Sequence, residues 1–186
     1  MEVKKCQVLV VGAGPGGYVA AIRAGQLGLN TIIVEGSRAG GTCLIRGCIP
    51  SKALIGVAQQ FQKLAKYATD AGHQGITIPG PAEIDMSSMI DWKEGIVDRL
   101  NKGVETLLGK AGVELVHGWA EFQDAKTVKI GEGSDAVLIE AENVILANGS
   151  IPIELPFMPY DENVISSKEA LELRKLPDHL VVVGGG

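Results

Sequence analysis

The sequence contains no long apolar segment, no cluster of basic residues and no leader before its first apolar run. The longest apolar runs have the length of a strand, which is too short for a membrane-spanning helix. The formal net charge is −5, which argues against a surface that binds nucleic acid. Residues 1–5 are too few for a signal peptide. We therefore expect a cytoplasmic protein that binds neither a membrane nor nucleic acid.

Aromatic residues are scarce as well, whereas glycine is abundant. Phe, Trp and Tyr make up 4% of the 186 residues, and glycine occurs 25 times. This composition predicts tight turns and a close-packed arrangement of small residues. The length allows one complete domain and the beginning of a second one.

Apolar periodicity predicts a strand–helix–strand unit at the start of the chain. Val8–Val11 is rich in valine, as is typical of a strand that is buried on both faces. A helical pattern of small apolar residues follows it. A second strand is expected at Thr31–Val34 and ends in Glu35. Such a unit predicts a parallel sheet.

Two amphipathic helices and several short strands are expected after this unit. The helices are predicted at 50–67 and 86–110, and the second should bury Val97, Leu100, Val104, Leu107 and Leu108. The short strands are predicted at 113–117, 119–122, 127–130, 137–140 and 144–146. We interpret them as an antiparallel insertion and a return to the central sheet. The predicted fold class is α/β, with a central parallel sheet and a small antiparallel β insertion.

A proline-rich connector predicts a domain boundary near residue 150. The first domain would comprise residues 1–150. Residues 151–186 would hold a short helix at 167–173 and a strand at 180–183 that runs into glycines. Because the first unit begins in the same way, we expect Gly184 and Gly186 to belong to the start of a second, incomplete nucleotide-binding unit.

The segment GAGPGG has the glycine spacing of a dinucleotide-binding loop. Gly12, Gly14 and Gly17 match G-x-G-x-x-G directly after a strand and at the start of a helix. These glycines allow a tight turn, close approach of the backbone to a pyrophosphate, and close packing of helix on strand. Glu35 could accept hydrogen bonds from a ribose diol and would repel a 2′-phosphate. FAD and NAD use the same loop, so the motif leaves the choice between them open.

Cys43 and Cys48 form a closely spaced pair before the second predicted helix, which we expect to begin at Pro50 or the next residue. The amino terminus of that helix and the nearby Lys52 favour a reactive thiolate. A metal site is disfavoured, because Cys6 and the three histidines supply no second ligand pair. A permanent structural disulfide is unexpected in a reducing compartment. A redox disulfide is therefore favoured, with two buried free thiols as the alternative.

The other residues whose side chains could react or bind a ligand are expected to have structural roles. Cys6 should be a buried, inert strand residue. No nucleophilic partner is apparent in the sequence for any of the three histidines, His73, His117 and His179. Trp92 and Trp119 are predicted to be packing residues.

Together these segments resemble the flavin-dependent disulfide oxidoreductases. GAGPGGYVAAIRAGQLG, GGTCLIRGCIPSKAL, DENVISSKEAL and LVVVGGG follow one another in the order of that family and span essentially the whole chain. CIPSKAL is the most discriminating segment, because it resembles the branch that oxidises dihydrolipoamide and differs from the glutathione and mercuric reductases. The resemblance implies a Rossmann-like FAD-binding domain, and it implies that the chain is an amino-terminal piece of the enzyme.

The resemblance also implies roles for individual residues. Cys43 would exchange with the dihydrolipoyl group, Cys48 would lie beside the flavin, and Lys52 would tune the flavin from nearby. The residues expected to contact FAD are Gly12, Gly14, Pro15, Gly16, Gly17, Glu35, Gly36, Gly41, Thr42, Cys43, Cys48, Lys52, Trp119, Ala120, Ala147, Asn148 and Gly149. Two residues depart from the family pattern: Asn148 stands where threonine is usual, and Ile45 where asparagine is usual.

The reaction that the resemblance implies is oxidation of a dihydrolipoyl group through the disulfide and FAD, with reduction of NAD⁺. The lipoyl group would be carried by the acyltransferase component of a 2-oxo acid dehydrogenase complex, and the full-length enzyme would be a homodimer. Two alternatives stay open. One is a non-catalytic module that binds FAD or NAD, and the other is a flavin disulfide reductase of the mercuric or glutathione type.

Overall fold

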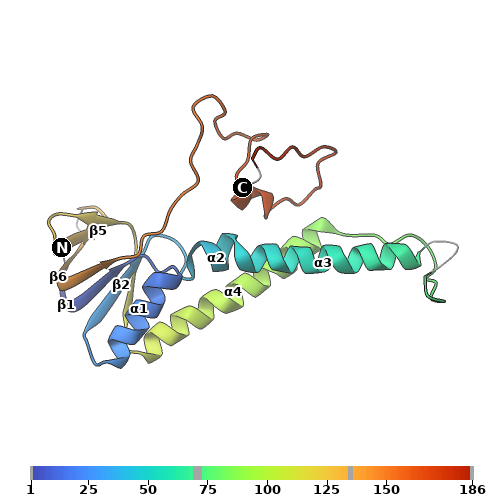
Figure 1. Cartoon of the computed structure of the whole chain (residues 1–186). Helices are drawn as coiled ribbons and strands as arrows, with labels where there is room; N and C mark the ends of the chain where they lie inside the picture. The colour runs from blue at the N-terminus through green and yellow to red at the C-terminus, as the bar shows by residue number, and fades with distance from the viewer. Residues whose placement is uncertain (1, 69–72, 134–135, 185–186) are drawn as a thin grey trace. The chain divides into compact units, whose positions relative to one another are not determined.

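The computed structural model describes residues 2–68, 73–133 and 136–184. Figure 1 shows its helices and strands in chain order. The strands are β1 (Glu2–Val11), β2 (Thr31–Glu35), β3 (Glu114–His117), β4 (Ala120–Phe122), β5 (Thr127–Ile130) and β6 (Val137–Leu146). The helices are α1 (Pro15–Gln26), α2 (Gly41–Arg46), α3 (Cys48–Tyr67), α4 (Met86–Lys110) and α5 (Ser167–Ala170).

The chain divides into two compact units. The first comprises residues 1–49 and 97–153, and the second comprises residues 50–96 and 154–186. The first unit therefore holds the sheet, α1, α2 and the carboxyl-terminal half of α4. The second unit holds most of α3, the beginning of α4 and α5. The predicted domain boundary near residue 150 stays a prediction.

The sheet has six strands in the order β3-β2-β1-β6-β5-β4. β1 pairs in parallel with both β2 and β6, and β2 pairs in parallel with β3. β5 pairs antiparallel with β6, and β4 with β5. The predicted α/β class, with a parallel sheet and an antiparallel insertion, is confirmed. The carboxyl ends of β1, β2, β3 and β6 meet at one edge, which is where ligands bind in open α/β sheets.

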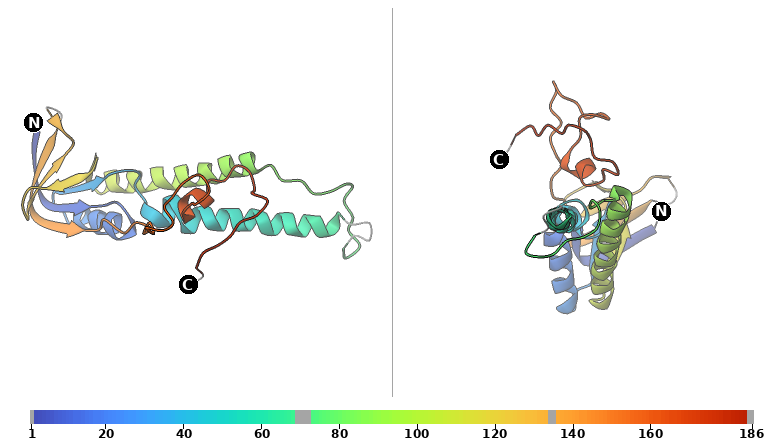
Figure 2. Two further views of the ribbon diagram at one scale, coloured as in Figure 1. Left: turned by 90° about the horizontal axis from the view of Figure 1, so that it is seen from above. Right: turned by 90° about the vertical axis from the view of Figure 1, so that its right-hand side faces the viewer.

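Alternating residues of the strands supply two apolar clusters, one on each face of the sheet. On one face, Val8 and Val10 of β1 pack with Ala21 of α1 and Val104 of α4. Figures 1 and 2 show α1 and the end of α4 side by side on this face. Leu9 of β1 belongs to the other cluster, to which β2, β5 and β6 contribute.

Small residues let α1 approach the segment after α4 closely, as the glycine-rich composition predicts. A side chain at Gly25 would overlap the carbonyl oxygen of Ala111 and would lie 2.9 Å from a methyl group of Val113. A larger residue at this position would therefore push α1 away from that segment.

The structure corrects several predicted elements. The strands expected at 137–140 and 144–146 are one continuous strand, β6, because its whole length pairs with β1. The segment 180–183 forms no strand, since among the described residues no neighbouring strand pairs with its backbone. The helix expected at 167–173 ends at Ala170. α4 has the predicted bounds.

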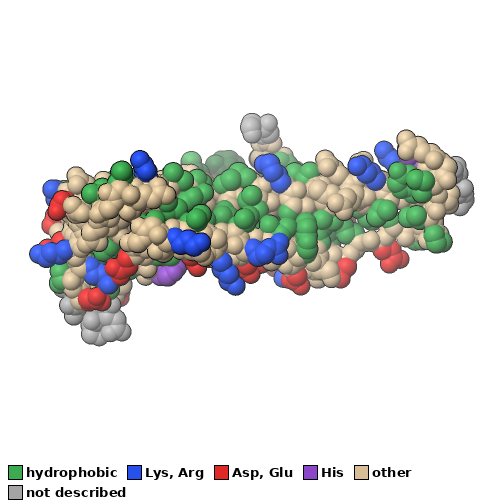
Figure 3. All heavy atoms as spheres, turned by 90° about the horizontal axis from the view of Figure 1, so that it is seen from below, with side chains coloured by type: hydrophobic (Ala, Val, Ile, Leu, Met, Phe, Trp, Pro, Cys, Tyr) green, Lys and Arg blue, Asp and Glu red, His purple; other side chains and the backbone are tan. Residues whose placement is uncertain are grey.

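The burial predicted for α4 is only partly correct. Val97, Val104 and Leu108 are buried, whereas Leu100 and Leu107 are 41% and 52% exposed. Trp92 is 51% exposed and Trp119 is 81% exposed, so neither ring is buried. Figure 3 shows hydrophobic side chains lying between charged ones on one face of the surface. None of the helices in the described part of the chain combines the length and the apolarity that crossing a bilayer requires.

Candidate functional site

The glycine loop between β1 and α1 lies at the carboxyl edge of the sheet, and two of its glycines are sterically required. Gly12 has a φ of +98°, and a side chain there would overlap the Ala147 carbonyl. A side chain at Gly17 would overlap the Gly12 carbonyl. Gly14 caps α1 and Pro15 occupies its first turn, where a missing N–H costs nothing. The loop therefore presents bare backbone and the amino terminus of α1, which together form a site suited to a phosphate group.

The Glu35 carboxylate is anchored beside this loop. Its Oε2 accepts a hydrogen bond from the Ala13 N–H at 2.8 Å. Its Oε1 accepts hydrogen bonds from the Ser37 N–H at 2.9 Å and from the Ser37 hydroxyl at 3.1 Å. A carboxylate has about four acceptor positions, so these three bonds fix its orientation and leave capacity for a hydroxyl donor. Glu35 is thus held where a ribose could donate to it. Sequence analysis missed Ser37, because no local pattern marks a serine that donates to a preceding glutamate.

The segment 36–41 connects β2 to α2 and lies against the glycine loop. The Gly40 N–H donates to the Ala13 carbonyl at 2.8 Å. Gly40 and Gly41 have φ values of +121° and +65°, which glycine adopts at little cost. A side chain at Gly41 would lie 2.5 Å from the Cα of Gly14, so the two backbones are in contact. The second loop thus begins α2 directly beside the candidate phosphate site.

Cys43 and Cys48 are joined by a disulfide, with their Cα atoms 4.6 Å apart. Cys43 lies in α2, a six-residue helix that sequence analysis missed because it is too short to show a period. α3 begins at Cys48 rather than at the predicted Pro50 or Ser51. Pro50 stands in its first turn, where the missing N–H removes no helix hydrogen bond. Cys48 therefore stands at a helix amino terminus, where the dipole and free N–H groups stabilise a thiolate. The exposed Lys52 follows one turn later in α3.

Other predicted site residues gather around the same edge of the sheet. The Trp119 ring lies over Gly36, where an added side chain would be 2.7 Å from the indole carbons. Just before it, the Gly118 N–H donates to the Glu35 carbonyl at 2.9 Å. Ala120 begins β4 and pairs with Ile130. Ala147 lies against Gly12 of the glycine loop. The next two residues, Asn148 and Gly149, are exposed.

The carboxyl-terminal glycines belong to a different part of the chain from the glycine loop. Gly184 is exposed, with a φ of +95°, and belongs to the second unit. Gly186 lies outside the described residues. The nucleotide-binding role predicted for these two glycines stays a prediction.

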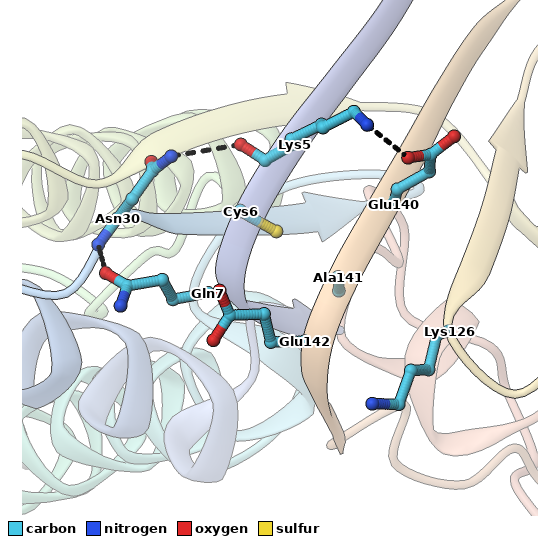
Figure 4. Close-up of a pocket in the computed structure, with 8 residues that line it drawn as sticks. All are labelled: Lys5, Cys6, Gln7, Asn30, Lys126, Glu140, Ala141 and Glu142. Atoms are coloured by element: carbon cyan, nitrogen blue, oxygen red, sulfur yellow. Dashed lines mark hydrogen bonds and ion pairs between the residues drawn. The ribbon is translucent and has the colours of Figure 1, made fainter.

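Cys6 lies in a separate pocket of about 410 Å³ near the amino-terminal half of β1 (Figure 4). Its thiol is free and buried, and burial raises its pKa. On the rim of the pocket, Lys5 forms an ion pair with Glu140 at 3.0 Å, and the Gln7 side chain accepts from the Asn30 N–H at 3.0 Å. The burial predicted for Cys6 is confirmed. Within the described ranges, no three His, Cys, Asp or Glu side chains converge as metal ligands would.

Comparison with known proteins agrees with this arrangement. Residues 6–186 match the model of a family described as pyridine nucleotide-disulphide oxidoreductase. The dihydrolipoyl dehydrogenase of Pseudomonas aeruginosa is 51% identical over 186 residues, which are 100% of this chain and 40% of that protein. Dihydrolipoyl dehydrogenase 2 of Haloarcula marismortui is 48% identical over 184 residues, with 97% of this chain and 38% of that protein covered. The chain thus spans about 40% of the length of these curated relatives.

Solved structures show the same fold. The HOCl-induced flavoprotein disulfide reductase RclA from Escherichia coli superposes with a TM-score of 0.78 at 25% identity. The match covers 97% of this chain and 37% of RclA.

Proposed function

Because the chain belongs to the pyridine nucleotide-disulphide oxidoreductase family, as its motifs predicted, we propose that it supplies the FAD site and the redox disulfide of a dihydrolipoyl dehydrogenase. The observation that carries this proposal is the contact between two functional segments of one compact unit. The loop that begins the helix of Cys43 touches the dinucleotide loop through the Gly40–Ala13 hydrogen bond and the Gly41–Gly14 contact. A cofactor on the dinucleotide loop and a reactive disulfide would therefore be held by neighbouring backbone.

The residues at the carboxyl edge of the sheet fit FAD. The pyrophosphate would bind on the bare backbone of Gly12–Gly17 and on the amino terminus of α1, where N–H groups and the helix dipole favour anions. The ribose of the adenosine would donate to the Glu35 carboxylate, which Ala13 and Ser37 hold in place. When bound, FAD supplies the two-electron carrier between a dithiol and NAD⁺.

The disulfide would act by thiol–disulfide exchange. A thiolate of the dihydrolipoyl group attacks the sulfur of Cys43, and the Cys43–Cys48 bond breaks, with its electron pair leaving on Cys48. The second lipoyl thiolate then attacks the lipoyl sulfur that is bonded to Cys43. The bond between the two breaks, and Cys43 is released as a thiolate. The substrate leaves as a cyclic disulfide, and both cysteines are reduced by the two electrons that it lost. The amino terminus of α3 stabilises the Cys48 thiolate during this step.

The names of these relatives favour a lipoyl substrate over glutathione. The relatives from Pseudomonas aeruginosa and Haloarcula marismortui are both named dihydrolipoyl dehydrogenase. The lipoyl group would be the one carried by the acyltransferase of a 2-oxo acid dehydrogenase complex, and NAD⁺ would be the final acceptor.

The visible absorption spectrum of the FAD-reconstituted chain tests this function. We expect flavin bands, and after anaerobic addition of dihydrolipoamide we expect a new long-wavelength band from a Cys48 thiolate beside the flavin. The variant Cys48→Ser is the matched control, since it has neither the disulfide nor the Cys48 thiolate that gives the band. Flavin bands that dihydrolipoamide leaves unchanged would indicate a non-catalytic FAD-binding module. A response to reduced glutathione in place of dihydrolipoamide would indicate a different disulfide reductase.

A further inference from the structure

The segment that begins the helix of Cys43 is rich in glycine and needs support from outside. Gly36, Gly40 and Gly41 give segment 36–41 wide backbone freedom. On one side, this segment is bonded to the glycine loop through Gly40 and Ala13. Near its other end, the Ser37 N–H and hydroxyl donate to the Glu35 carboxylate. Residues 38 and 39 lie between these two restraints.

Two polar side chains of α4 hold the opposite side of the segment. The Asn101 side-chain amide donates a hydrogen bond to the Ala39 carbonyl at 2.7 Å. The Asp98 carboxylate forms an ion pair with the Arg38 guanidinium at 2.5 Å. Asp98 and Asn101 are three residues apart, so they lie on the same side of α4. All four residues belong to the first compact unit.

The Asn101 bond is the more important of the two, because its acceptor is buried. Ala39 is completely buried, and a buried carbonyl that loses its donor cannot bond to water instead, so the loss destabilises the folded chain. The ion pair is more exposed, with side-chain exposures of 35% for Arg38 and 54% for Asp98, and such pairs contribute little. Asn101 and Asp98 thus hold two adjacent residues in the middle of the segment, and Asn101 makes the more buried of the two contacts.

The segment passes this restraint to the disulfide. Directly after Ala39, Gly40 packs against the side chain of Leu44 in α2, where an added side chain would be 2.8 Å from it. α2 starts at the next residue, Gly41, and carries Cys43 in its first turn. We propose that Asn101, assisted by Asp98, is a positioning residue that sets the place of Cys43 relative to Cys48 through segment 36–41. This inference rests on the redox role proposed for the disulfide.

The equilibrium between this disulfide and dithiothreitol tests the proposal without FAD or a lipoyl substrate. The chain is equilibrated in buffers of defined redox potential, trapped by alkylation and analysed by mass spectrometry. Asn101→Asp keeps the shape of the side chain but replaces the donor with a second acceptor. We expect its equilibrium constant for forming the disulfide to fall about tenfold, which corresponds to about 30 mV. Asp98→Asn should shift it in the same direction by a smaller factor.

Two controls separate positioning from general destabilisation. Lys102→Gln changes an exposed side chain beside Asn101. Val128→Ala removes buried volume from the apolar cluster on the other face of the sheet, to which segment 36–41 does not contribute. Both should leave the disulfide equilibrium within twofold of wild type, and far-UV circular dichroism checks that every variant is folded. The proposal is overturned if folded Asn101→Asp also stays within twofold, or if Val128→Ala shifts the equilibrium equally. Failure of dihydrolipoamide to reduce the wild-type disulfide would instead count against the proposed function alone.

Discussion

Glu35 illustrates how single residues acquire their roles in this protein. Its carboxylate bonds to the backbone of the glycine loop at Ala13 and to the next loop at Ser37. A side chain bound on both sides cannot rotate freely, so it presents its remaining acceptor positions in one direction. Fixed acceptors bind a diol better than mobile ones, because less side-chain entropy is lost on binding.

The three cysteines should differ in their reactivity. After reduction, we expect iodoacetamide to modify Cys43 and Cys48 before Cys6 in the native chain. Cys6 is 5% exposed, and burial raises its pKa, so at neutral pH it is both shielded and protonated. Its modification should accelerate as the pH rises. Time-resolved mass spectrometry measures the three rates.

The same raised pKa has a consequence for stability. Because the Cys6 thiol ionises more easily in the unfolded chain, its contribution to the free energy of unfolding is complete below the unfolded pKa. That contribution is lost as the pH rises toward the folded pKa. Cys6→Ser is the control for both effects. Modification of Cys6 as fast as that of the pair would contradict the assigned burial.

Adjacent leucines of α4 provide a test at the scale of one element. Leu108 is 1% exposed and belongs to the core cluster under the sheet, whereas Leu107 is 52% exposed. We expect Leu108→Ala to lower the free energy of unfolding by about 2–5 kcal/mol. Leu107→Ala should change it by no more than about 0.5 kcal/mol. Urea denaturation measures both, and equal losses would mean that the wrong face of α4 has been assigned to the core.

Periodicity predicted the bounds of α4 but not which of its apolar residues are buried. Leu100 and Leu107 fit the apolar stripe of the helix as well as Val104 does. Their exposure depends on how far the sheet and α1 extend beneath the helix, which a pattern within one helix does not contain. The short α2 was missed for a related reason. It is held by the loop contacts of Gly40 and Gly41 rather than by an apolar stripe.

At the scale of the whole molecule, the two ends of the chain should differ in their resistance to proteolysis. Residues 171–184 have no regular secondary structure and are largely exposed. Limited digestion with trypsin should therefore cut after Lys175 before it cuts after Arg23 in α1 or Lys129 in β5, because a protease needs a locally unfolded backbone. Mass spectrometry of the fragments over time gives the order. A first cut within α1 or β5 would show that the sheet is less stable than its buried strands indicate.

The amino-acid sequence by itself determined the local chemistry of this protein. The spacing of Gly12, Gly14 and Gly17, the acid at the end of β2 and the close pair of cysteines are all contained in short segments, so local patterns suffice to recognise them. The parallel sheet was also predicted from a local pattern, the strand–helix–strand unit at the start of the chain. The family was recognisable because these segments occur in a fixed order.

Only the tertiary structure decided how these parts restrain one another. The strict need for glycine at position 12 comes from the Ala147 carbonyl, and the Trp119 ring lies over Gly36. The segment that leads to Cys43 is held by Asn101. Each of these contacts joins residues that are far apart in the chain. No periodicity or motif within one segment reports such a contact, because the energy of packing depends on the partner that folding brings alongside.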